Sequence, residues 1–222
     1  MSESPILEAS NIHKAYGDIE VLRGIDIHVD RGEIISVVGA SGAGKSTLLH
    51  ILGSLDRPDT GELSIGGQKV NSLSRNNLAA FRNSQIGFVF QFHNLLPEFT
   101  ALENVCIPGY IGHRKQAVVE AKARELLLML GLEKRLNHKP SQLSGGEQQR
   151  AAVARALVND PKIVFADEPS GNLDSHNAEE LHKLFFDLRQ KLNLSFVIVT
   201  HNINLADMAD RKLTIEDGKI LQ

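Results

Sequence analysis

The sequence has little that would place the protein outside the cytoplasm or within a membrane. It contains one cysteine, Cys106, so an internal disulfide is impossible and a reducing compartment is expected. No apolar run approaches the roughly 18 residues of a membrane-spanning helix. The start, "MSESPILEAS", lacks the basic and apolar segments of a secretory signal. We therefore expect a soluble, cytoplasmic protein in which Cys106 is a small buried hydrophobic residue.

The net charge of the chain is also small. The 24 Lys and Arg residues stand against 27 Asp and Glu, which gives a formal net charge of −3. A general affinity for nucleic acid or for anionic lipid is therefore not expected, and any membrane association would pass through partner proteins. The hydrophobic share of 42% in 222 residues is typical of a globular chain with a sizeable core.

Short apolar runs alternate with helical patterns along the chain. The runs are rich in β-branched residues and nearly continuous, which is typical of parallel strands covered on both faces. Helical periodicity follows over residues 116–130, which end before Gly131, and over 177–193. Glycine turns between short strands, in the first 30 residues and in 61–70, indicate a small antiparallel sheet. The four apolar runs are 34–38, 86–90, 162–166 and 195–200.

These patterns predict one α/β domain over residues 1–222. We expect a mostly parallel core sheet between helices, formed by about 1–91 and 159–222. A helical subdomain of about 92–158 is inserted into it, and the antiparallel β patch lies on the N-terminal side.

Each apolar run is followed by residues suited to binding or catalysis. The first continues into Gly39 and a glycine loop, the second into Gln91, the third into Asp167 and Glu168, and the fourth into His201. Ligands of open α/β sheets bind at the carboxyl ends of the strands. The coincidence at four strand ends therefore predicts one site.

The glycine loop "GASGAGKST" matches the pattern G-x-x-x-x-G-K-[ST], between a strand and the helical segment "TLLHIL". Glycines let backbone N–H groups surround phosphate oxygens, and a helix N-terminus adds partial positive charge. Lys45 would reach the β- and γ-phosphates, and Ser46 would bind Mg²⁺. The expected phosphate-binding residues are Gly39, Ala40, Ser41, Gly42, Ala43, Gly44, Lys45, Ser46 and Thr47.

The polar residues after the later strands suit the hydrolysis of a phosphate bond. Asp167 fits a second Mg²⁺-organising carboxylate. Glu168 would face the other way, because adjacent residues of an extended chain point in opposite directions, and it could act as general base to a water molecule. His201 could donate a hydrogen bond to the γ-phosphate. The plainer alternatives are solvated carboxylates at a loop entrance and a structural histidine.

The stretch "LSGGEQQR" predicts a second anion site. Ser144 and Glu147 fit a capping box that opens an alanine-rich helix, and a well-capped helix is one sufficient explanation. The sequence Ser144-Gly145-Gly146 also leaves backbone N–H groups accessible at that helix start. One nucleotide does not need two cradles from one chain. A two-fold dimer would let each second cradle close over the partner's nucleotide.

Taken together, these residues resemble the ATP-binding subunit of an ABC transporter across essentially the whole chain. "GASGAGKST" resembles the Walker A loop, "FVFQ" the Q-loop, "LSGGEQQR" the signature, "IVFADEP" Walker B, "SGNLD" the D-loop and "VTH" the switch histidine. The resemblance implies ATP and Mg²⁺ as cofactors, a head-to-tail homodimer, and separate integral membrane subunits.

The family's roles carry over residue by residue. The residues expected to act in catalysis are Lys45, Glu168, His201 and Gln91. The residues expected to bind the metal are Ser46, Gln91 and Asp167. Tyr16 would stack on adenine. The signature residues Ser144, Gly145 and Gly146 and the D-loop Asp174 would complete the partner's site.

Within the family the chain is most similar to ATPases of lipoprotein-releasing systems at the inner membrane, by "SGNLD" and by the segment 91–108. Its Ser170 replaces the threonine of related efflux and cell-division ATPases, and these two groups are the alternatives. The apolar loop Gln91–Thr100 either receives the membrane subunits or packs in the core. A chromosome-structuring ATPase is excluded, because 47–143 is too short for a long coiled coil.

Overall fold

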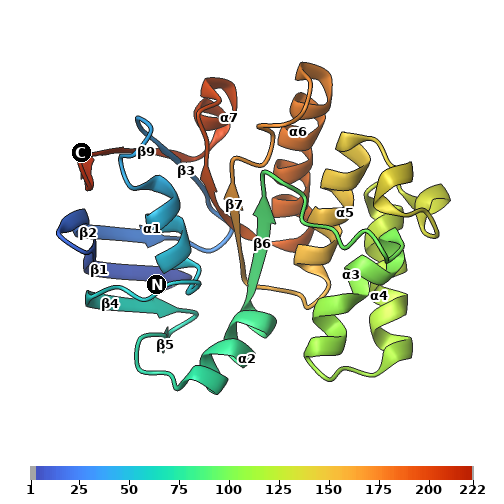
Figure 1. Cartoon of the computed structure of the whole chain (residues 1–222), viewed down its shortest axis with the longest axis horizontal. Coiled ribbons are helices and arrows are strands. Elements are labelled where there is room, and N and C mark those ends of the chain that lie inside the picture. Colours follow the sequence, from blue (N-terminus) through green and yellow to red (C-terminus); the bar gives the residue numbers. More distant parts are fainter. Residues whose placement is uncertain (1–3, 222) are drawn as a thin grey trace.

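The computed structural model describes residues 4–221, and within them the strands form two sheets (Figure 1). The strands are β1 Leu7–Tyr16, β2 Ile19–Val29, β3 Ile34–Val38, β4 Thr60–Ile65, β5 Gln68–Lys69, β6 Ile86–Phe90, β7 Ile163–Asp167, β8 Ser195–Val199, β9 Arg211–Glu216 and β10 Lys219–Leu221. The α-helices are α1 Lys45–Leu52, α2 Arg75–Gln85, α3 Ala101–Ile111, α4 Gln116–Met129, α5 Gly145–Leu157, α6 Ser175–Leu192 and α7 Ile203–Met208, with 3₁₀ turns η1 Glu133–Arg135 and η2 Pro140–Gln142.

The larger sheet has six strands among the described residues, in the order β10-β9-β3-β8-β7-β6. Strands β9, β3, β8, β7 and β6 run parallel, and only β10 is antiparallel to its neighbour. The four strands expected from apolar runs are β3, β6, β7 and β8. Every residue of β8 is buried, because helices cover both faces of this sheet. Because β3, β6, β7 and β8 run parallel, their carboxyl ends lie at the same edge of the sheet, as predicted.

The smaller sheet, in the order β2-β1-β4-β5, is antiparallel and confirms the expected N-terminal β patch. Helix α1 packs between it and the parallel sheet, where Leu48, Leu49, Ile51 and Leu52 are all buried. This packing fixes the start of α1 relative to the end of β3, and so it holds the glycine loop between them.

Helices α3, α4 and α5 pack on one another at the end of the molecule away from the antiparallel sheet (Figure 1). They fall within the segment 92–158 that the sequence predicts to be helical. Helix α4 ends just before Gly131, whose φ of 71° only glycine adopts easily, and the N–H of Leu132 returns to the carbonyl of Leu127. Cys106 in α3 is 1% exposed, which confirms that it is a buried hydrophobic residue.

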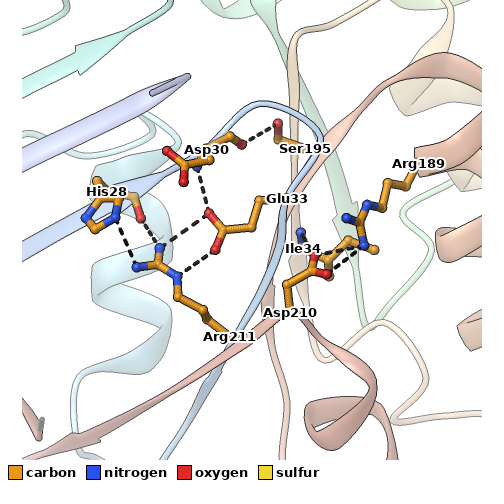
Figure 2. Close-up of polar contacts among 8 residues, drawn as sticks. All are labelled: His28, Asp30, Glu33, Ile34, Arg189, Ser195, Asp210 and Arg211. Atoms are coloured by element: carbon orange, nitrogen blue, oxygen red, sulfur yellow. Dashed lines mark hydrogen bonds and ion pairs between the residues drawn. The ribbon is translucent and has the colours of Figure 1, made fainter. Parts of the chain in front are cut away.

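An ionic cluster around the buried Glu33 joins the strands at the edge of the parallel sheet opposite the predicted site (Figure 2). Glu33 is 9% exposed and accepts a 2.6 Å bond from Nε of Arg211 at the start of β9, while the Arg211 guanidinium also donates to the carbonyl of His28. The Asp210 carboxylate accepts the N–H of Ile34, at the start of β3. These bonds attach the C-terminal strands to the rest of the sheet.

Among residues 4–221, none of the helices combines the length and the apolar character needed to cross a bilayer.

Candidate functional site

The loop between β3 and α1 has a backbone that glycine makes possible. Gly42 and Gly44 have φ values of 80° and 105°, in the left-handed region that other residues rarely adopt. At Gly39, a Cβ atom would lie 2.2 Å from the carbonyl oxygen of Ile215 in β9. Glycine is therefore required at Gly39 by the close approach of a neighbouring strand, and at the other two positions by conformation.

The loop lines a cavity of about 260 Å³ that also contains Glu168. The residues that line this cavity include Ser41, Lys45 and Thr47. Nζ of Lys45 donates to the carbonyl oxygens of Gly39 and Ala40, at 2.9 Å each, so the lysine bridges its own loop. The ammonium group therefore lies where it can meet an anion held by the loop.

Ser46 and Asp167 bring two oxygen ligands together. Oγ of Ser46 donates to Oδ1 of Asp167 over 3.4 Å, across the start of α1 and the end of β7. Burial raises the pKa of the Asp167 carboxyl, although the Ser46 hydrogen bond acts in the opposite direction. A hydroxyl and a carboxylate are the kind of oxygen ligands that Mg²⁺ takes beside phosphates.

Glu168 lies next to Asp167 but outside the strand. The sequence predicts an extended chain here, and this prediction is wrong: β7 ends at Asp167, and Glu168 has a φ of 46°. The side chain nevertheless meets His201, whose Nδ1 lies 2.8 Å from Oε2 of Glu168. The His201 backbone N–H donates to the same oxygen over 3.1 Å. The ends of β7 and β8 are thus joined through this pair.

Gln91 follows β6 and contacts the segment 170–174. Its Nε2 donates to Oδ1 of Asn172 over 3.0 Å, and Nδ2 of Asn172 donates back to the Gln91 carbonyl over 3.3 Å. A Cβ atom on Gly171 would lie 2.9 Å from Nε2 of Gln91. The predicted metal-sensing glutamine is therefore held against the predicted D-loop.

Tyr16 lies at the end of β1 with 51% of its surface exposed. Its hydroxyl donates to Oδ2 of Asp56 over 2.7 Å, and this bond raises the pKa of Tyr16. Nζ of Lys14 lies 5.2 Å from the ring centroid. The exposed ring is thus fixed in position and can stack on a flat ligand.

The predicted second cradle is at the start of α5. Ser144 and Glu147 form the expected capping box: Oγ of Ser144 accepts the N–H of Glu147, and the Glu147 carboxylate accepts the N–H of Ser144. The hydrogen bond from Arg135 lowers the pKa of Glu147. Neither Ser144, Gly145 nor Gly146 lines the cavity that contains Lys45 and Glu168. Within one chain the two predicted cradles therefore stay apart.

One residue that the sequence argument missed connects these elements. Gln149 in α5 is 0% exposed, and its Nε2 donates to the carbonyls of Phe90, over 3.2 Å, and Pro169, over 2.7 Å. It therefore ties the signature helix to the residues next to Gln91 and Glu168. A polar residue on the buried face of a helix, three positions before Ala152, was the signal available in the sequence.

Comparison with known proteins decides the family. The profile of the family described as ABC transporter matches residues 22–171, which is more than half of the chain. This chain belongs to the ABC transporter family. It is an ATP-binding cassette with a P-loop NTPase fold, and it is an ATPase, as its sequence predicts.

Curated relatives match over nearly their whole length. The "lipoprotein-releasing system ATP-binding protein LolD" of Cytophaga hutchinsonii is 63% identical over 216 residues, which cover 97% of this chain and 99% of the relative. Proteins of the same name from Bacteroides fragilis and Porphyromonas gingivalis are 54% and 57% identical. They cover 97% and 96% of this chain, and the matches span 100% and 97% of their own lengths.

Solved ABC cassettes share the fold. A dimeric cassette, MJ0796, in a post-hydrolysis state with ADP and Pi, superposes with a TM-score of 0.88 at 41% identity, over 97% of both chains. The cassette cbiO1 from Clostridium perfringens has a TM-score of 0.90 at 27% identity, over 99% of this chain and 88% of its own.

Proposed function

We propose that this chain is the ATP-hydrolysing subunit of a lipoprotein-releasing ABC transporter. Two copies would drive separate membrane subunits from the cytoplasmic face of the inner membrane. The observation that carries the proposal is the full-length similarity to proteins named LolD, at 54–63% identity. A cavity that both Lys45 and Glu168 line supports it.

The glycine loop would hold the triphosphate of ATP. Nζ of Lys45 now bonds two carbonyl oxygens, which are weaker acceptors than phosphate oxygens, so the ammonium would turn to the β- and γ-phosphates. The N–H groups around Gly42 and at the start of α1 would bind the remaining oxygens. Tyr16 would stack on the adenine, with its hydroxyl fixed by Asp56.

The donor set at the ends of α1 and β7 fits Mg²⁺. Ser46 and Asp167 would hold the ion, and the carbonyl oxygen of the Gln91 side chain would approach it from β6. Burial raises the pKa of Asp167 and so disfavours the charged carboxylate. A dication beside the carboxylate would act in the opposite direction and favour the charged form. When bound, the ion would supply positive charge that offsets the negative charge of the phosphate groups.

Glu168 would act as general base. Its carboxylate lines the same cavity as Lys45, so it lies where it can accept a proton from a water molecule directed at the γ-phosphate. His201 would position this carboxylate through Nδ1 and its backbone N–H. After the Glu168 contact is released, the imidazole could instead donate to the γ-phosphate.

A second copy of the chain would complete the site. Ser144, Gly145 and Gly146 start a helix whose first N–H groups are available to an anion, and they lie outside their own chain's cavity. In a head-to-tail homodimer they would face the partner's γ-phosphate. Asp174, the N-cap of α6, would lie at the interface between the two sites.

The loop Gln91–Thr100 would receive the membrane subunits. Phe92 is 68% exposed, and Leu96 and Phe99 are 43% and 41% exposed, so apolar side chains cluster on an accessible loop. Arg155 of α5 donates to two backbone carbonyls of this loop, which fixes its shape. Force at the loop would thus reach the signature helix directly.

Affinity purification from native membranes tests the proposal. The tagged chain is extracted with a mild detergent, and the co-purifying proteins are identified by mass spectrometry. Membrane subunits with a large periplasmic domain, and ATPase activity that rises when lipoprotein substrate is added, are expected. Recovery with cell-division proteins or with an efflux pump instead would assign the chain to one of the alternative branches.

A further inference from the structure

The first turns of α5 and α6 touch at Gly146 and Asn177. A Cβ atom built on Gly146 would lie 2.3 Å from Oδ1, 2.9 Å from Cγ and 3.4 Å from Cβ of Asn177. These are its three nearest neighbours outside its own helix and its chain neighbours. The missing side chain of Gly146 therefore makes room for Asn177 of the same chain.

Conformation does not account for this glycine. Gly146 is the second residue of α5 and has no left-handed φ, so alanine could adopt the same backbone and would favour the helix. Within one chain, the close approach of Asn177 is the constraint that excludes a side chain here.

Asn177 also holds the D-loop carboxylate. Its backbone N–H donates to Oδ1 of Asp174 over 2.9 Å, and its Nδ2 donates to Oδ2 over 2.6 Å. These two hydrogen bonds lower the pKa of Asp174. One side chain thus contacts a signature glycine with its amide oxygen and the D-loop aspartate with its amide nitrogen.

We propose that Asn177 is a positioning residue that fixes the signature turn to the D-loop. The spacing between the Gly146 backbone and the Asp174 carboxylate is set by this amide, so both elements reach the partner's nucleotide in one fixed arrangement. The inference rests on the head-to-tail dimer of the proposed function. It adds a residue that binds neither nucleotide nor metal.

The test uses the Glu168→Gln chain, in which ATP and Mg²⁺ should trap a dimer, and compares dimerisation constants by analytical ultracentrifugation. Gly146→Ala should weaken ATP-dependent dimerisation by more than about tenfold, because its Cβ collides with the Asn177 amide. Asn177→Ala removes both atoms that lie within 3.0 Å and leaves only an ordinary contact at 3.4 Å. The double variant should therefore dimerise better than Gly146→Ala alone and match Asn177→Ala.

Controls separate positioning from folding and from nucleotide binding. Lys183 lies on the exposed face of α6, the helix that contains Asn177. Adding Lys183→Ala to Gly146→Ala should therefore not restore dimerisation. Binding of a fluorescent ATP analogue to the monomer should be unchanged in every variant, because the chain's own phosphate loop is untouched. In the otherwise native chain, Asn177→Ala should lower kcat with little change in ATP affinity, and circular dichroism should show a folded protein.

A double variant no better than Gly146→Ala would overturn the inference, and so would an Asn177→Ala chain that dimerises and hydrolyses ATP like its parent. A Glu168→Gln parent that stays monomeric with ATP and Mg²⁺ would give a different pattern. That result would overturn the homodimer of the proposed function and this role of Asn177 with it.

Discussion

Nδ1 of His201 lies 2.8 Å from Oε2 of Glu168, and the His201 backbone N–H donates to the same oxygen over 3.1 Å. The carboxylate is therefore held by the residue after β8 although it belongs to the segment after β7. Because the contact uses one carboxylate oxygen, the other can accept a proton from water. This arrangement suits a base that is positioned before the substrate arrives.

Glu168→Gln tests this role. The amide keeps the size of the side chain but cannot take a proton, so kcat should fall by about 10²- to 10⁴-fold while ATP still binds. With ATP and Mg²⁺ the variant should elute as a dimer on size exclusion, because the bound nucleotide is not consumed.

Glu62→Gln, an exposed carboxylate on β4, is the matched control and should hydrolyse ATP like the native chain. A Glu168→Gln chain with native turnover would remove the general base from the mechanism.

Mixing two inactive variants tests the shared site. Lys45→Ala should lose hydrolysis because the phosphates lose their cation, and Ser144→Arg should lose it because the bulky side chain blocks the second cradle. In their heterodimer, the sound loop of the Ser144→Arg chain faces the sound signature of the Lys45→Ala chain. The mixture should therefore recover ATPase activity, up to the fraction of native activity expected when each heterodimer has one working site.

Two Ser144→Arg chains have no intact signature, so adding more of that variant alone should restore nothing. If the mixture is as inactive as its components, the two cradles do not act across a dimer.

Arg211→Ala tests the ionic cluster opposite the site (Figure 2). The change leaves the Glu33 carboxylate, 9% exposed, without its 2.6 Å partner. Oε2 of Glu33 keeps the N–H of Asp30, but Oε1 is left without a partner, which should lower the free energy of unfolding by about 1–3 kcal/mol. Urea unfolding measures this, and ATP turnover per folded molecule should be unchanged because the cluster lies at the far edge of the sheet.

Glu33→Gln with Arg211→Ala should recover part of the loss, since a neutral amide is easier to bury than a carboxylate. Equal stability of Arg211→Ala and the native chain would mean that the ion pair contributes nothing to folding.

The sequence predicted the parallel strands and the site edge well, because both depend on local patterns. A continuous apolar run such as 195–199 can only be a buried strand or helix, and its length favours a strand. The loop around Lys45 has a motif whose backbone chemistry is fixed by its glycines. Both features can be recognised from neighbouring residues of the chain alone.

What the sequence could not supply was the contacts between distant segments. Gln149 bonds Phe90, 59 residues away, and nothing near it in the chain indicates that partner. The turn at Glu168 was also missed, since a left-handed φ at a glutamate has no local signal, and the residues that Glu168 bonds, Val199 and His201, come from another part of the chain. Tertiary packing decides such details.

His182 gives a pH dependence to stability. Its side chain is on the buried face of α6, with the residue 4% exposed, and Nε2 lies 3.0 Å from Oγ of Ser170, the first residue of the segment 170–174. Burial lowers the pKa of His182 below its ordinary value of 6.5, although the charge of Glu179 acts in the opposite direction. Folding therefore favours the neutral ring.

The unfolded chain binds a proton at this histidine below about pH 6.5, whereas the folded chain does so only at lower pH. The contribution to stability is therefore present above pH 6.5 and is lost as the pH falls through the folded pKa. Over that interval one such group changes the free energy of unfolding by at most about 1.4 kcal/mol per pH unit. His182→Gln keeps a polar partner for Ser170 but does not titrate.

Urea unfolding at pH 7.5, 6.5 and 5.5 should thus show a smaller acid loss for His182→Gln than for the native chain. His176→Gln, on an exposed position of the same helix, should leave the loss unchanged. If the native chain and His182→Gln lose the same free energy between pH 7.5 and 5.5, the proton is taken up elsewhere.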